Sequence, residues 1–139
     1  MTEPSIIERS VEKAHVWLND LAEQLGTDDH RLAYRVLRAY LHALRDRLTV
    51  DETAQLAAQL PELIRGIYYE GWNPSSTPVR YRDFADFLDR VAADAALDGE
   101  TAASYAVSAT AGVLRRHVSA GEIEDIRAIL PENLRPILG

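Results

Sequence analysis

Apolar residues recur at the spacing of amphipathic helices along most of the chain. A first stripe predicts a helix that ends at Gly26, and its members are Ala14, Trp17, Leu18, Leu21 and Leu25. A second stripe predicts the next helix, with Ala33, Leu37, Tyr40, Leu44 and Leu48 on its buried side. No segment alternates apolar and polar residues over the length of a strand, so we expect essentially no β-sheet.

Two shorter helices are expected to follow, and their first residues are typical of helix starts. Thr49 and Glu52 have the spacing of a capping box, in which each side chain accepts a hydrogen bond from the backbone amide of the other residue. Pro61 suits the first turn of a fourth helix, where its missing N–H is no loss. Asp28 is the expected cap of the second helix. Four helices therefore account for residues 14–68.

The same pattern occurs a second time at a constant offset and without a gap, so that position 14 corresponds to position 84 and position 68 to position 138. Leu60-Pro61-Glu62 corresponds to Leu130-Pro131-Glu132, and Leu44-Arg45 corresponds to Leu114-Arg115. Ser119 and Glu122 repeat the capping box, and Asp98 repeats the expected cap Asp28. Equal helix and connection lengths indicate a tandem duplication. We predict an all-α fold of two four-helix repeats, 14–68 and 84–138, with about eight helices related by a pseudo-two-fold axis and sharing one core in a single domain, 1–139.

The segment between the two copies, residues 69–83, is the one candidate linker. Its polar residues and prolines predict an extended and somewhat stiff backbone. Trp72 in this linker has two interpretations. In the structural one, which we favour, its ring is buried against the helices and its N–H is paired. In the functional one, Trp72 anchors a partner, together with Tyr68, Tyr69 and Tyr81.

Cationic side chains gather on one side of the second predicted helix. At 100° per residue they fall within an arc of about 80° that faces away from the apolar side. This arginine stripe consists of Arg31, Arg35, Arg38, His42 and Arg45. On an exposed face these groups could bind carboxylates or phosphates, because a guanidinium is a planar fork of donors. The favoured interpretation is a solvated face whose charges pair with nearby acids such as Asp28 or Asp46.

Composition narrows the classes of function. The chain has 139 residues, a net charge of −7 and no cysteine. The charge argues against a general attraction to nucleic acid or anionic membrane, although a local patch could bind either. The absence of cysteine excludes disulfides and thiol nucleophiles. The first residues lack a secretory signal, and the longest uncharged run is too short and too polar to span a bilayer, so we expect a cytoplasmic protein without membrane contact.

Motifs for catalysis or for a cofactor are not evident. The sequence contains no Gly-rich phosphate loop, no nucleophile elbow and no His-Glu-x-x-His metal motif. Glu12 and His15 have the spacing used in carboxylate-bridged di-metal bundles, but such a site needs a second pair, and Ala85 stands at the position that corresponds to His15. We therefore expect no metal and no cofactor.

The run from Leu60 to Trp72 resembles a bacterial family known as domain of unknown function 2267. Its most specific part is Tyr69-Glu70-Gly71-Trp72, which is followed by Thr77-Pro78-Val79. The similarity extends over nearly the whole chain, from about residue 10, and includes the later run from Val113 to Pro131. The resemblance implies a soluble helical protein of bacteria and archaea with no established activity. It carries over no catalytic or ligand residue.

Two hypotheses of function follow from these observations. The favoured one is a non-enzymatic interaction module that binds a protein partner, or a second copy of itself, through an exposed helical face, with Tyr69 and Trp72 as candidate contacts. The alternative is binding of a phosphate-rich ligand or nucleic acid through the arginine stripe. An enzyme is a third and less favoured class, because it would need a pocket lined by carboxylates or histidines.

Overall fold

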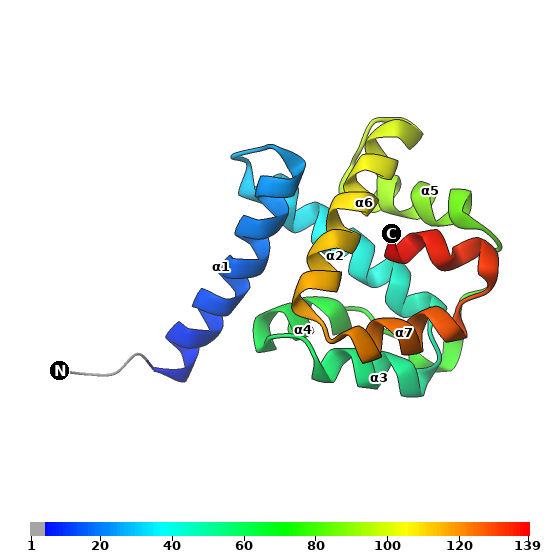
Figure 1. The fold of residues 1–139 in the computed structure, drawn as a ribbon, viewed down its shortest axis with the longest axis horizontal. Coiled ribbons are helices and arrows are strands. Elements are labelled where there is room, and N and C mark those ends of the chain that lie inside the picture. Colours follow the sequence, from blue (N-terminus) through cyan, green and yellow to red (C-terminus); the bar gives the residue numbers. More distant parts are fainter. Residues whose placement is uncertain (1–4) are drawn as a thin grey trace.

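A computed structural model describes residues 5–139, which form an all-α fold with no strand in that range (Figure 1). Its first half contains α1 (Ile6–Leu25), α2 (His30–Arg47), α3 (Val50–Ala58) and α4 (Glu62–Tyr69). A short 3₁₀ helix, η1 (Pro74–Ser76), lies in the connection. The second half contains α5 (Phe84–Ala95), α6 (Gly99–His117), α7 (Ala120–Ile129) and the 3₁₀ helix η2 (Glu132–Leu138).

One continuous apolar core joins the two halves. α1 packs on α2 and α6, and α5 packs on the same two helices, so that α2 and α6 run through the middle of the molecule. The stripes expected from the sequence are buried in both central helices, including Leu37, Tyr40 and Leu44 of α2 and Val107 and Leu114 of α6. The expected all-α fold and its principal core positions are therefore confirmed.

Several expected helix caps differ in the structure. Asp29, not Asp28, caps α2, because its carboxylate accepts hydrogen bonds from the amides of Arg31 and Leu32. α1 begins at Ile6, before the first residue of the predicted apolar stripe, Ala14, since Ser5 and Glu8 form a complete capping box. The signal was present in the sequence as Ser5-Ile-Ile-Glu8. This earlier start gives α1 an additional N-terminal stretch that projects from the body of the molecule (Figure 1).

The last element of each half differs in type. α4 is a regular α-helix, whereas η2 is a 3₁₀ helix that contains Pro136. Gly66 stands at the corresponding place in α4. A proline inside a helix removes a backbone donor and its ring clashes with the preceding turn, which explains why the expected α-helix does not form in the second half.

The connection between the halves is attached to α2. The Val79 amide donates to the Asp46 carbonyl over 2.6 Å, and the Tyr81 hydroxyl donates to the Ala43 carbonyl over 3.0 Å. The Tyr81 ring also lies under the guanidinium groups of Arg47 and Arg90. Tyr81 thus attaches this segment to the core, the role that the sequence had suggested for Trp72.

Candidate interaction site

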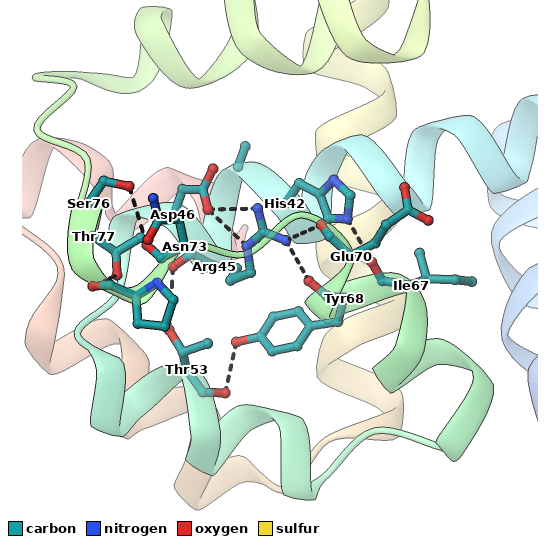
Figure 2. A network of polar contacts seen from close by, with 12 residues as sticks. His42, Arg45, Asp46, Thr53, Ile67, Tyr68, Glu70, Asn73, Ser76 and Thr77 are labelled. Atoms are coloured by element: carbon teal, nitrogen blue, oxygen red, sulfur yellow. Dashed lines mark hydrogen bonds and ion pairs between the residues drawn. The ribbon is translucent and has the colours of Figure 1, made fainter.

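The C-terminal end of α4 is held by a buried arginine of α2. Arg45 Nη1 donates to the carbonyl oxygens of Tyr68 and Glu70, each over 2.8 Å (Figure 2). The same guanidinium forms an ion pair with Asp46 at 2.8 Å, and Arg45 is only 4% exposed. Carbonyls at the end of a helix lack partners within the helix and carry partial negative charge. Arg45 therefore satisfies them as a cationic C-cap supplied by another helix.

His42 supports the same end of α4. Its Nε2 lies 2.6 Å from the Ile67 carbonyl oxygen, a contact that requires the proton on Nε2 (Figure 2). Burial lowers the pKa of His42, the hydrogen bond to Ile67 acts in the opposite direction, and the charges of Arg45 and Arg38 lower the pKa further. The ring is thus neutral near pH 7, because its pKa lies below the ordinary value of 6.5.

Further hydrogen bonds attach α4 to α3. The Tyr68 hydroxyl donates to the Thr53 carbonyl over 3.0 Å (Figure 2). Arg65 donates from Nε to the Ala57 carbonyl over 2.8 Å and from Nη2 to the Leu60 carbonyl over 2.9 Å. α4 is therefore fixed at its C-terminal end by α2 and along its length by α3.

The expectation that the whole arginine stripe faces outward is wrong for two of its members. His42 and Arg45 are buried under α4, although Arg31 and Arg35 are exposed. Arg35 donates to the Ala95 carbonyl of α5 over 3.1 Å, and Arg38 pairs with Glu70. The physical reason is that α4 folds back over the polar side of α2, and helical spacing alone does not reveal such a contact.

The contacts of Arg45 and His42 with the end of α4 form a clamp. Tyr69 and Trp72 lie together at the surface beside it. Their ring centroids are 5.3 Å apart, and both side chains are partly buried. Trp72 Nε1 is buried without a hydrogen-bond partner, so the expected pairing of this N–H is wrong. Arg38 reaches the same segment through Glu70, which lies between the two aromatic residues in the chain. Arg31 and Arg35 do not contact this segment.

A hollow of about 340 Å³ lies between the N-terminal half of α1 and the start of α4. We call it the α1/α4 groove, and its lining residues are Ile6, Arg9, Ser10, Lys13, Leu60, Pro61, Glu62 and Arg65. Ser10 Oγ approaches Glu62 Oε2 at 3.4 Å across the bottom of the groove. Because the clamp fixes α4, it also fixes one wall of this groove.

Large apolar side chains remain exposed on α1 and α4, and of these Ile6 lines the groove. Ile7 is 69% exposed and Val11 is 40% exposed, both on the N-terminal half of α1, and Leu63 is exposed on α4. Ile6 and Val16 on α1 are exposed as well. The apolar stripe predicted for the first helix has Ala14 as its first member, so Ile6 lies outside that prediction.

α1 is held against α6 by a separate polar group on another part of its length. Asp20 accepts hydrogen bonds from Arg116, at 2.8 and 3.1 Å, and from His117 Nε2 at 2.9 Å. Burial raises the pKa of Asp20, but the hydrogen bonds and charges of Arg116 and His117 outweigh this effect and lower it. The C-terminal half of α1 is therefore firmly docked, and its N-terminal half extends from that anchor.

A pair of buried carboxyl groups replaces the expected capping boxes. Thr49 and Ser119 do cap α3 and α7 by accepting from the amides of Glu52 and Glu122, but the reciprocal bonds from the two carboxylates are not formed. Glu52 and Glu122 instead meet each other, and both are buried. The sequence carried one signal for this contact: the two residues occupy the same position in the two predicted repeats.

The structure also bears on metal binding and on membrane insertion. Within residues 5–139, no group of three or more His, Cys, Asp or Glu side chains is placed to hold a metal ion. Glu12 and His15 lie exposed on α1. None of the helices in the described part of the chain combines the length and apolar character needed to cross a bilayer.

These features define an all-helical protein whose polar groups serve mainly to join its helices. The chain belongs to the family described as Uncharacterized conserved protein (DUF2267), whose profile matches residues 14–137. The resemblance seen in the sequence is thereby confirmed. A comparison with curated proteins gave no match.

Proposed function

We propose that this protein is a non-enzymatic cytoplasmic interaction module that binds an acidic amphipathic helix of a partner protein in the α1/α4 groove. The observation that carries the proposal is the groove itself, in which the exposed Ile6 of α1 faces Leu60 and Pro61 at the start of α4, with basic side chains beside them. An amphipathic helix binds such a groove by placing its apolar face against apolar walls.

The charge of the groove supports an acidic partner. Within residues 5–139, Lys13 and Arg65 line it together with the one acid Glu62, whereas the whole chain carries a net charge of −7. A local excess of positive charge attracts a carboxylate-rich segment and steers its association. The same net charge works against self-association, because two copies repel each other.

The arginine stripe gives less support to the alternative function. His42 and Arg45 already donate to backbone carbonyls of α4, and Arg38 pairs with Glu70. Few exposed cations remain to bind phosphates, and the affinity of a phosphate-binding site depends on the number of such cations. We therefore propose the groove, rather than the stripe, as the binding surface.

A synthetic amphipathic peptide with leucines on one face and glutamates on the other provides the probe, and fluorescence anisotropy measures its binding. We expect Ile6→Asp and Lys13→Glu each to weaken binding about tenfold or more, because they remove apolar contact and complementary charge. Val50→Asp is the matched control, since Val50 is an exposed apolar residue of α3 that does not line the groove.

Three results would contradict the proposal. The first is binding of the glutamate peptide no tighter than that of a peptide with lysines in place of the glutamates. The second is an equal loss of binding in Val50→Asp. The third is a dimer, measured by light scattering, that Ile6→Asp dissociates, because it would assign the groove to a second copy of the chain.

We also propose that the fold arose by tandem duplication and that its halves are related by a pseudo-two-fold axis. In support, α1 and α5 end at Leu25 and Ala95, and α2 and α6 end at Arg47 and His117, so that both pairs of helix ends keep the offset between the two sequence repeats. Superposition of residues 14–68 on 84–138 in a crystal structure tests the proposal, which fails if the helices do not overlay in the same order.

A further inference from the structure

Glu52 and Glu122 form an isolated pair of carboxyl groups where α3 contacts α7. The two helices lie side by side in Figure 1 and join the first half of the chain to the second. Glu52 is 4% exposed and Glu122 is 6% exposed. Glu52 is close enough to Glu122 to raise the pKa of its carboxyl, so the two side chains are neighbours.

Among the described residues, 5–139, no cation forms an ion pair with Glu52 or Glu122. Asp125 of α7 adds a further negative charge. Tyr68 of α4 lies within electrostatic reach, but its hydroxyl donates to the Thr53 carbonyl. Arg135 of η2 is exposed, and it is not among the groups that shift the pKa of Glu122. Within residues 5–139, no donor reaches Glu52 Oε1 or Glu122 Oε2.

Two ionised carboxylates cannot satisfy each other, since each can only accept hydrogen bonds. Burying both as ions without a cation would be strongly unfavourable, because like charges repel in a poorly solvated site. A carboxylic acid beside a carboxylate removes the difficulty, since its O–H donates to the neighbouring oxygen. We propose that Glu52 and Glu122 share one bound proton, and that this proton holds α3 against α7. The contact between these two helices, the α3/α7 joint, loosens when the proton is lost.

The direction of the pKa shift agrees with this assignment. Burial raises the pKa of Glu122 to about 8, and the hydrogen bond and charge of Glu52 and the charge of Asp125 contribute in the same direction. A raised pKa in the folded state means that the folded protein keeps a proton that the unfolded chain releases. The resulting stability is fully present below about pH 4.5 and is lost as the pH rises to about 8.

Water can reach the pair for proton exchange. A hollow of about 460 Å³ lies beside it, between α3 and α7, and its lining includes Gln55, Glu122 and Asp125. One other polar bond crosses this joint, from the Ser119 amide to Gln59 Oε1 at 3.2 Å. That bond contains no titratable group, so loss of the proton should loosen the joint locally and leave the remaining helices packed.

The experiment follows thermal unfolding between about pH 5 and pH 8.5 in the unmodified protein, Glu52→Gln, Glu122→Gln and the control Glu23→Gln, which changes an exposed residue of α1. We expect the melting temperature of the unmodified protein and of the control to fall with rising pH by about 5 °C or more relative to either pair variant. Amide exchange in residues 50–58 and 120–129, corrected for intrinsic base catalysis, should accelerate with pH only where the pair is intact.

Parallel melting curves for all four proteins would overturn the proposal. A rise in melting temperature on adding Mg²⁺ or Ca²⁺ near pH 8.5, if it requires both glutamates, would also overturn it by identifying a cation site. Should the glutamine variants fail to fold, carboxyl carbon NMR on the unmodified protein remains decisive. One glutamate should then titrate above about pH 7, and titration of every glutamate below about pH 6 would contradict a shared proton.

Discussion

Arg45 of α2 donates to the backbone carbonyl of Tyr68 at the end of α4, and the second half of the molecule contains the corresponding contact. Arg115 donates to the carbonyl of Leu138, and these two residues follow Arg45 and Tyr68 in the sequence at the same offset. In each half an arginine of the second helix therefore holds the final helical element. This explains why Arg45 is the one member of the arginine stripe with a basic counterpart in the other half.

Replacing Arg45 should destabilise the fold strongly. Arg45→Ala leaves the Tyr68 carbonyl buried without a donor and Asp46 without its cation, and we expect a loss of about 2–4 kcal/mol in the free energy of unfolding. Urea denaturation measures this change. Arg31→Ala, at the exposed start of the same helix, is the control and should change stability by less than about 0.5 kcal/mol. Equal effects of the two substitutions would show that the contacts of Arg45 do not contribute to the free energy of unfolding.

His42 should make the protein less stable in mild acid. Its pKa is lowered mainly by burial, so the unfolded chain takes up a proton on this histidine at a higher pH than the folded protein does. Its contribution to stability is therefore lost as the pH falls below about 6.5 toward the lower pKa of the folded state.

The comparison with His42→Gln isolates this effect, because the variant keeps an N–H donor and does not titrate. Between about pH 7.5 and pH 5.5 the melting temperature of the unmodified protein should fall relative to that of the variant. The exposed His30 provides the control substitution, His30→Gln, which should track the unmodified protein. If the unmodified protein and His42→Gln change in parallel, the prediction is wrong.

The helix ends at Gly26 and Ala96 should respond to substitution in opposite directions. Both residues adopt the left-handed conformation after α1 and α5, with φ of 67° and 55°. An alanine in this conformation is strained by about 1 kcal/mol relative to glycine, because its Cβ crowds the following carbonyl. An added Cβ at Gly26 would meet no neighbouring atom, so its cost is confined to the backbone.

We therefore expect Ala96→Gly to raise the free energy of unfolding by about 0.5–1 kcal/mol and Gly26→Ala to lower it by about 1 kcal/mol. Urea denaturation of both variants provides the measurement. Destabilisation by Ala96→Gly would show that the greater flexibility of glycine in the unfolded chain outweighs the relief of strain.

The groove illustrates how far a candidate site can be predicted from the sequence. Ser5 and Glu8 mark the early start of α1, and Ile6 is recognisable as an apolar position on it. The sequence does not show that Ile6 stays exposed beside α4, because another helix could have covered it. Likewise, the pairing of Glu52 with Glu122 required knowing that α3 and α7 meet.

The sequence by itself determined the helices of this protein and their apolar faces, because helix formation and amphipathic spacing depend on residues close together in the chain. The buried positions Leu37 and Leu44 of α2 could be identified on that basis. Only the tertiary structure decided which polar residues remain in water. Arg31 is exposed and Arg45 is buried on the same side of α2, because α4 returns over one end of that helix, and contacts between distant segments leave no periodic trace in the sequence.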